Sequence, residues 1–503
     1  MKKLNYFLIA VLTVFAFSCN NDTDDPPTAV IDAPTINAPS VATTVQVGKV
    51  VTMTFGVNAP GTVAEVTVAT TGGTAVITSA SIVGETTGNV EVTFTAPLTD
   101  GTETVTLTVK DAQATPKSTD GTAPVTVTLA ATSDTDLLVT QFASAPVFDG
   151  VIDDMWNTAQ QLVSFVEVPS NLGNRNTYYN EAGIGEQDLD IFEAYEAEKY
   201  DFTMRAGTFG SDIYFLIEWA DDEDSKDRQS WYFDDVAKLW KGQHKYANDA
   251  NDKYYEDKFA FLFPITEVVG FSSATCYATC HTASTINKDK DKHTRHYLKN
   301  VDEKIDMWHW KRVRGTYLGQ VDDQKITYED EPWNSSTNGR HGDGTGSGGY
   351  ANNSQTLTIT GTATEVSVPM YVIPGATEYF WIDPDQIADG TAKKVMEVDA
   401  NGVLTLDDAS TIDPADGGFE DGTGNKRMPS ILTSTFTEGR GDISIQYMHT
   451  GTGWVCEVKR ALNTNDEDDV IFANGTELDF GFAIFNNAAI GHAIKPGLKL
   501  KWE

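Results

Sequence analysis

Hydrophobic and polar residues alternate along much of the chain, and this period of two predicts β-strands rather than helices. The N-terminal part carries short alternating runs between PG, GG and DG turns, namely VVTMTFGV (50–57), TVTLTVKDA (104–112) and VTVTLAA (125–131). Longer and more aromatic runs follow, namely DIYFLIEWADD (212–222), DKFAFLFPI (257–265), GWVCEVKRAL (453–462) and LDFGFAIFNN (478–487). We therefore expect an all-β protein built from sandwich-like domains.

A change of composition near residue 133 predicts two such domains. Residues 29–132 are rich in Thr, Val, Ala and Gly, with only Phe55 and Phe94 as aromatics, and resemble an immunoglobulin-like spacer domain of bacterial surface proteins. Residues 133–503 predict a larger β-sandwich with long acidic loops. Its best short helix candidates are 153–163 and 302–314, and the Gly-, Asp- and Thr-rich region from about 335 to 440 reads as an insertion.

The N-terminus predicts export and attachment to a membrane by lipid. MKK is followed by the apolar run LNYFLIAVLTVFAF, which is short for a membrane span, and then by Cys19. Ala16-Phe17-Ser18-Cys19 resembles a bacterial lipobox, so we expect a lipoprotein signal peptide at 1–18, acylation of Cys19 and an acidic tether at 19–28. A plain signal peptide is the alternative. The expected location is the outer membrane, on its periplasmic face or at the cell surface.

The acidic composition argues against a nucleic-acid partner. The formal net charge is −37, whereas phosphate binding needs a surface rich in Lys and Arg. The chain has four cysteines, so three are left if Cys19 is acylated, and one of these cannot form an internal disulfide. Cys456, in the alternating run Trp454-Val-Cys456-Glu-Val458, is expected to be a buried free thiol.

Cys276-Tyr-Ala-Thr-Cys280-His281 is the main candidate for chemistry. Covalent haem attachment needs two thiols and a histidine directly after the second thiol, so that the imidazole lies under the iron. The usual spacer is two residues, and three is a less common variant. Two alternatives are open: a zinc site that adds His293 and His296, and a simple disulfide. Neither alternative gives His281 a role.

Several segments, in this order and spacing, carry a resemblance from about residue 140 to the end of the chain. They are VFDGVIDDMW (147–156), IYFLIEW (213–219), EDKFAFLFP (256–264), DMWHWK (306–311), GGYAN (348–352) and WVCEVKRAL (454–462). Together they resemble the haem-binding subunit family of ethylbenzene dehydrogenase and related dimethyl-sulfoxide-reductase-type enzymes. The resemblance implies a β-sandwich that holds one haem for electron transfer. Some members hold the haem without covalent links, and others carry a Cys-x-x-(x)-Cys-His loop.

Within that resemblance Cys276 and Cys280 are the thioether anchors of a haem c, and His281 is the proximal iron ligand. Members that bind haem without covalent links use Met and Lys, for which the nearest counterparts are Met307 and Lys495.

The sixth ligand has two further candidates. His309 would share a strand face with Met307, and His492 lies in GHAIKPG. Trp308 and Trp310 are expected to be core residues, and Arg460 is expected to pair with an acidic loop rather than with a haem propionate.

These observations predict a monohaem electron-transfer lipoprotein that is not itself an enzyme. Its partner would be another cytochrome or a molybdenum oxidoreductase, and its only membrane contact the lipid anchor. One alternative is an exported carbohydrate-binding module in which Cys276 and Cys280 form a disulfide. The other is a surface protein whose Asp-rich loops, DPDQIADG (383–390) and NTNDEDD (463–469), bind calcium, although neither fits the twelve-residue calcium loop.

Overall fold

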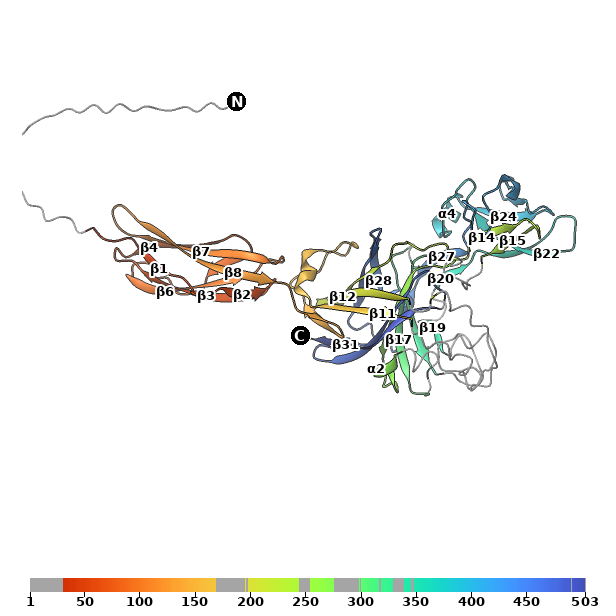
Figure 1. Ribbon diagram of the computed structural model, residues 1–503. Helices are drawn as coiled ribbons and strands as arrows, with labels where there is room; N and C mark the ends of the chain where they lie inside the picture. The colour runs from red at the N-terminus through yellow and green to blue at the C-terminus, as the bar shows by residue number, and fades with distance from the viewer. Residues whose placement is uncertain are drawn as a thin grey trace, which may run out of the picture. The chain divides into compact units, whose positions relative to one another are not determined.

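The computed structural model describes residues 30–168, 195, 198–243, 254–275, 298, 300–315, 318–328, 339–344, 348–489 and 491–502. The chain divides into two compact units (Figure 1). The first comprises residues up to 45, 49–96 and 102–126, and the second comprises 46–48, 97–101 and 127–503. Strands dominate both units and the helices are short, so the predicted all-β class is confirmed.

The first unit is built from two four-stranded sheets. One has the order β1-β3-β6-β5 and the other β2-β8-β7-β4. Their bounds are β1 Thr35–Asn37, β2 Thr43–Gln46, β3 Val50–Asn58, β4 Val63–Thr70, β5 Thr74–Ile77, β6 Thr87–Thr95, β7 Gly101–Asp111 and β8 Ser118–Thr128. Buried and exposed positions alternate along β3 and β6, and the two aromatics, Phe55 and Phe94, are fully buried. Each sheet therefore has one apolar face and one face in water.

The second unit is built around a thirteen-stranded sheet of order β19-β18-β17-β16-β30-β31-β10-β12-β13-β29-β28, with β11 and β9 paired beside it. The bounds are β9 Thr132–Ser133, β10 Asp136–Gln141, β11 Gln161–Glu167, β12 Lys199–Phe209, β13 Asp212–Ala220, β16 Lys258–Pro264, β17 Lys304–Lys311, β18 Asp322–Thr327, β19 Arg340–Gly342, β28 Ser444–His449, β29 Gly453–Ala461, β30 Glu477–Phe485 and β31 Ala493–Trp502. An antiparallel bridge joins Gln320 to Ser444. The segment before β18 therefore meets the edge strand β28, and the sheet curls around one core.

Aromatic rings fill that core because every second residue of the strands points inward. Phe261 of β16 lies 5.9 Å from Trp308 of β17 and 5.1 Å from Phe482 of β30, measured between ring centroids. Trp219 of β13 lies 6.0 Å from Trp454 of β29. Trp308 and Trp310 are core residues, as predicted.

The two predicted helices differ from the structure. Residues 302–314 contain strand β17, Lys304–Lys311, instead of a helix, and residues 153–163 contain only the 3-10 helix η1, Asp154–Thr158, before β11 begins. All but one of the residues of β17 are buried, on both of its faces. An apolar–polar period of two is therefore missing from the sequence, and periodicity alone cannot distinguish such a strand from a buried helix.

The inserted region, 348–436, has small sheets and a core of its own. Its elements, with the hairpin that packs into the same core, are β14 Trp231–Asp234, β15 Leu239–Gly242, β20 Gly348–Asn352, β21 Gln355–Thr358, β22 Glu365–Val368, β23 Tyr371–Val372, α4 Pro384–Ala388, β24 Lys393–Val398, β25 Leu404–Leu406, β26 Thr411–Ile412, η5 Pro414–Asp416 and β27 Ile431–Phe436. Two further short helices are α2 Phe271–Ala274 and η6 Glu438–Gly441. Among the described residues, no helix has the length and apolar character to cross a bilayer.

Candidate functional site

A hollow lies on one face of β16, β17 and β30, opposite to the face that carries the aromatic core. Leu262 pairs with both Met307 and Gly481, so these positions share that face. The small residues Ala260, Gly481 and Ala483 leave space above the sheet. The cavity volume is only about 30 Å³, with about 410 Å³ of unfilled space out to the open mouth, so the described residues form one wall of a site. They are Ala260, Leu262, Thr275, Met307, Gly481, Phe482, Ala483, Phe485, His492 and Ile494.

The structure brings three of the four sixth-ligand candidates together around Phe485. Met307 and His492 both line the hollow, and the His492 ring stacks on Phe485 with 4.6 Å between centroids. The His309 ring lies 5.6 Å from the same phenyl ring. Lys495 is not brought to this place, because its ammonium group lies 4.4 Å from the ring of Phe165.

The remaining site candidates lie outside the described residues. These are Cys19, the haem-attachment candidates Cys276, Cys280 and His281, and the alternative zinc ligands His293 and His296. Thr275, which lines the hollow, is the last described residue before Cys276. The chain therefore leaves the described part of the structure at the hollow, one residue before the Cys-x3-Cys-His sequence.

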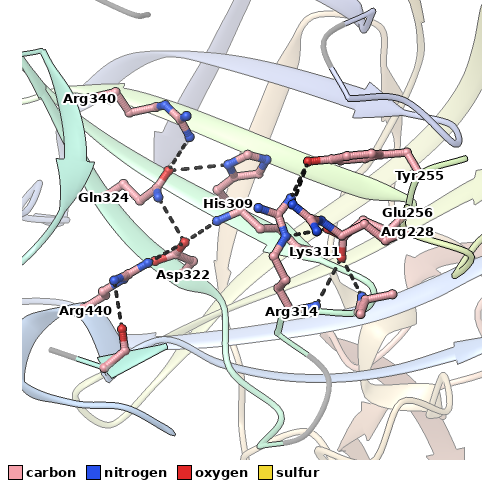
Figure 2. A network of polar contacts seen from close by, with 12 residues as sticks. Arg228, Tyr255, Glu256, His309, Lys311, Arg314, Asp322, Gln324, Arg340 and Arg440 are labelled. Atoms are coloured by element: carbon pink, nitrogen blue, oxygen red, sulfur yellow. Dashed lines mark hydrogen bonds and ion pairs between the residues drawn. The ribbon is translucent and has the colours of Figure 1, made fainter. Parts of the chain in front are cut away.

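His309 is held as a neutral imidazole whose tautomer its neighbours determine (Figure 2). Its Nδ1 lies 3.4 Å from Oε1 of Gln324, and the Gln324 amide nitrogen donates to Asp322 at 2.9 Å. Arg340 also donates to Gln324 Oε1, at 3.1 Å, so this oxygen is an acceptor and Nδ1 of His309 carries the proton. Burial, together with the positive charge of Lys311 and other cations nearby, holds the pKa of His309 well below its usual value.

Nε2 of His309 is therefore a buried lone-pair donor. Among the described residues it has no hydrogen-bond partner. A neutral imidazole whose other nitrogen is held by a carbonyl oxygen is the usual form of a metal-ligating histidine. The donor set around Phe485, a thioether and imidazoles beside an apolar wall, fits the requirements of a haem iron.

Six cations surround this wall in an otherwise acidic protein. We call the following residues the cationic cluster: Arg228, Lys258, Lys311, Arg314, Arg340 and Arg440. Figure 2 labels all of them except Lys258. Two carboxylates face them: Glu256 pairs with Arg314 and Arg228, and Asp322 pairs with Lys311 and Arg440. These six cations and two carboxylates together carry a formal net charge of +4, which favours binding of an anion.

The cationic cluster extends to the hollow through Lys258. Its ammonium nitrogen lies 4.2 Å from the ring centroid of Phe485 and donates to the carbonyl oxygen of Ala489. At the other end, the positive charge of Lys311 lowers the pKa of Tyr350 to about 7, with a further contribution from Arg314. An apolar wall therefore borders a strongly positive rim.

Sequence reasoning did not identify this cationic cluster, although a signal was present. The run Lys311-Arg312-Val-Arg314 directly follows Met-Trp-His-Trp in a chain with 36 basic and 73 acidic residues. Arg228, Arg340 and Arg440 come from distant parts of the chain, and only the fold brings them together. Gln324 was missed because its role depends on its place beside His309 across β17 and β18.

Comparisons with known proteins give little information about the fold. No curated protein matches the chain. Among solved structures, domains 4 and 5 of the S-layer protein SbsC are 22% identical over 20% of this chain and 52% of that one, with a TM-score of 0.15. The adhesin InvE of Yersinia pseudotuberculosis is 11% identical over 69% of this chain and 70% of that one, with a TM-score of 0.16. The chain spans about half the length of the SbsC fragment, and similarity at these TM-scores carries no argument.

A family model gives a clear result for the second unit. The model described as ethylbenzene dehydrogenase matches residues 153–495, about two thirds of the chain. This range contains the hollow and the cationic cluster. Because the family is one of redox enzymes, the match contradicts the expectation that the protein is not an enzyme. The chain belongs to the ethylbenzene dehydrogenase family.

Proposed function

We propose that this protein carries one covalently attached haem c and serves as the electron-transfer part of an oxidoreductase of its family. The observation that carries the proposal is the position of the hollow. Met307 and His492 line it, and it is reached by the chain at Thr275, directly before Cys276-x3-Cys280-His281. A separate zinc or disulfide function for that sequence would leave this donor-lined wall without a role.

In this proposal Cys276 and Cys280 form the thioether links, His281 is the proximal ligand and Met307 is the sixth. The haem supplies a one-electron ferric/ferrous couple. Ala260, Gly481 and Ala483 provide a flat apolar wall that excludes water. The cationic cluster provides the positive charge that two propionate carboxylates require, and Lys258 is the member closest to the hollow.

His309 has a positioning role in this scheme. Its neutral ring, held by Gln324, lies between the hollow and the cationic cluster. Because its ring is buried and neutral, His309 adds no positive charge near the redox centre.

Export, acylation at Cys19 and a redox partner protein complete the proposal. A lipid anchor would hold the protein at the outer membrane, and the net charge of −37 would favour a partner with a basic docking face. Another cytochrome and a molybdenum oxidoreductase both fit this description.

The first experiment is expression of the full chain with a cytochrome c maturation system. We expect a Soret band, a reduced-minus-oxidised spectrum typical of haem c, and haem that stays with the polypeptide on a denaturing gel. Cys276→Ser with Cys280→Ser should abolish the covalent haem. A colourless wild-type protein whose two thiols react only after reduction would refute the proposal.

The sixth ligand is tested by Met307→Leu, which conserves side-chain volume, compared with His492→Gln and His309→Gln. We expect only Met307→Leu to remove the weak absorption band that a methionine–iron bond gives at the red end of the visible spectrum. We also expect only this variant to lower the reduction potential. Loss of low-spin character in one of the histidine variants alone would assign the ligand to that histidine instead.

The carbohydrate-binding alternative has less support. Stacking on sugar rings needs exposed aromatic side chains, whereas Trp156, Trp219, Trp308, Trp310 and Trp454 are all buried.

A further inference from the structure

Seven aspartates gather where β17, β18 and β19 meet the loop that follows β29. Asp306 and Asp323 lie on the neighbouring strands β17 and β18, on the faces opposite to Met307 and Gln324. This acidic cluster is therefore distinct from the hollow. Its members are Asp306, Asp323, Asp343, Asp442, Asp466, Asp468 and Asp469.

Two triads of carboxylates form the centre of the acidic cluster. In the first, one oxygen from each of Asp306, Asp323 and Asp469 lies within 4.8 Å of the others. The second triad, Asp343, Asp466 and Asp468, meets the same limit. Three carboxylate oxygens at such spacing surround a point that a single cation can reach.

The two triads are linked through the backbone, because the Asp343 amide donates to the carbonyl oxygen of Asp323 at 3.1 Å.

Each triad contains a fully buried aspartate without a hydrogen-bond donor. Both oxygens of Asp343 lack a partner among the described residues, and its exposed fraction is 0%. Asp323 is equally buried, and neither of its oxygens has a hydrogen-bond partner among the described residues. A buried carboxylate without a donor is costly, so each of these side chains requires a ligand that no described residue provides.

The charge balance of the acidic cluster also indicates that a positively charged ligand is needed. Arg460 pairs with Asp306 at 2.8 Å, and Lys304 and Lys325 both pair with Asp468. Three cations thus face seven carboxylates, and four negative charges are left.

We propose that the acidic cluster binds two calcium ions, one in each triad. All the available ligands are oxygens, which favours a hard cation over zinc, copper or iron. Calcium accepts six to eight oxygens in a flexible arrangement, whereas magnesium demands a near-ideal octahedron. Two divalent ions also supply the four positive charges that the cluster lacks.

Local geometry leaves room for the second triad. A Cβ atom on Gly439 would lie 2.8 Å from Oδ2 of Asp466, so glycine at this position allows that carboxylate to approach. The ions would tie the loop 463–469 to β17 and β18, the strands that carry Met307 and Gln324 on their other faces. NTNDEDD therefore contributes ligands to sites assembled from distant segments, and this explains why it does not fit a linear calcium motif.

Calcium binding is measured on the full chain by equilibrium dialysis and calorimetry after chelation, and it needs no haem. We expect two ions per wild-type chain and a higher melting temperature in calcium than in chelator. Asp323→Asn and Asp343→Asn should each lose one ion. In chelator each variant should melt at or above the wild-type temperature, because it removes a buried negative charge from an uncompensated cluster.

Glu467→Gln is the matched control, since Glu467 is exposed and lies in the same loop between Asp466 and Asp468. It removes one negative charge but should keep both ions. Absence of calcium binding by the wild-type protein would overturn the proposal, as would equal loss in Glu467→Gln. If the wild-type protein binds only one ion and both Asn variants lose it, the assignment of two separate sites is wrong. If magnesium at the same concentration fills both sites with equal affinity, the choice of calcium is wrong.

Discussion

At the scale of single residues, Glu457 fixes the backbone turn of VFDGVIDDMW (147–156), the motif near the start of the second unit. One carboxylate oxygen accepts hydrogen bonds from the amides of Asp149 and Gly150, at 3.0 and 2.8 Å. The other accepts from the indole nitrogen of Trp156, at 2.9 Å. Gly150 has a φ of 81°, and a Cβ there would lie 2.9 Å from the Tyr447 nitrogen, so glycine is required. One buried side chain thus holds the whole turn.

We therefore expect Glu457→Ala to leave three donors without acceptors and to cost about 3 kcal/mol or more in the free energy of unfolding. Glu457→Gln should cost less, about 1–3 kcal/mol, because the glutamine keeps one acceptor oxygen. The remaining cost arises because its NH2 group replaces the other oxygen and faces hydrogen-bond donors. Urea denaturation followed by tryptophan fluorescence measures both values. The exposed Glu477, paired with Lys499, is the control, and a Glu477→Gln effect as large as that of Glu457→Gln would contradict this explanation.

Tyr350 offers a pH-dependent test of the cationic cluster. Its pKa is lowered to about 7, first by the charge of Lys311, so the tyrosinate is favoured in the folded protein. The unfolded chain, with a tyrosine pKa of about 10, binds the extra proton between these values. The stability of the haem-free protein should therefore rise as the pH increases from about 7 to 10, and this contribution is lost as the pH falls through 7.

Ultraviolet titration of tyrosinate in the haem-free protein, compared with Tyr350→Phe, measures this ionisation. One tyrosine should ionise near neutral pH in the wild type, and the phenylalanine variant should lack that step. If the carboxylates of a haem occupy the cationic cluster, the step should move to higher pH in the haem-loaded protein. An identical titration of wild type and Tyr350→Phe would show that the cluster does not hold a tyrosinate.

Some residue roles follow from sequence and others do not. Alternation around Cys456 predicted a buried free thiol, and the structure confirms it. Arg460 pairs with Asp306 and lies 3.8 Å from Asp469, so its predicted acidic partner is also confirmed. The roles of Gln324 and Asp323 were not predictable, because each depends on which strand lies next to β18.

At the scale of elements, β17 joins the hollow to the acidic cluster. Alternation places Met307 and His309 on one face and Asp306, Trp308 and Trp310 on the other. Both faces are buried, which is why the sequence pattern of this strand was mistaken for a helix. The same burial explains how a single strand can serve two sites of opposite charge.

The small residues of β16 and β30 lead to a prediction at this scale. Ala483 is only partly buried and faces the hollow, so Ala483→Leu should fold while it fills the wall that a haem would contact. We expect most of the covalent haem to be lost, as measured by the ratio of Soret to protein absorbance. Ala483→Ser, which keeps the volume small, is the control. Normal haem content in Ala483→Leu together with an unchanged spectrum would place the haem elsewhere.

At the scale of the whole molecule, opposite charges are segregated although the chain is strongly acidic overall. The cationic cluster and the acidic cluster lie on opposite faces of β17 and β18. Composition alone gives the −37 charge but does not predict this separation, because Arg228, Arg314 and Arg440 are far apart in sequence. The fold class was predictable from alternation, which is local, whereas both sites depend on long-range strand pairing.

The two units of the chain lead to a prediction for the whole protein. All ten tryptophans lie beyond residue 150, so tryptophan fluorescence reports only on the second unit, while circular dichroism reports on both. Thermal melting should show two transitions by circular dichroism and one by fluorescence. Calcium should raise only the transition seen by fluorescence, because ligands stabilise the unit that binds them. A single transition common to both probes, shifted as one by calcium, would show instead that the two units unfold together.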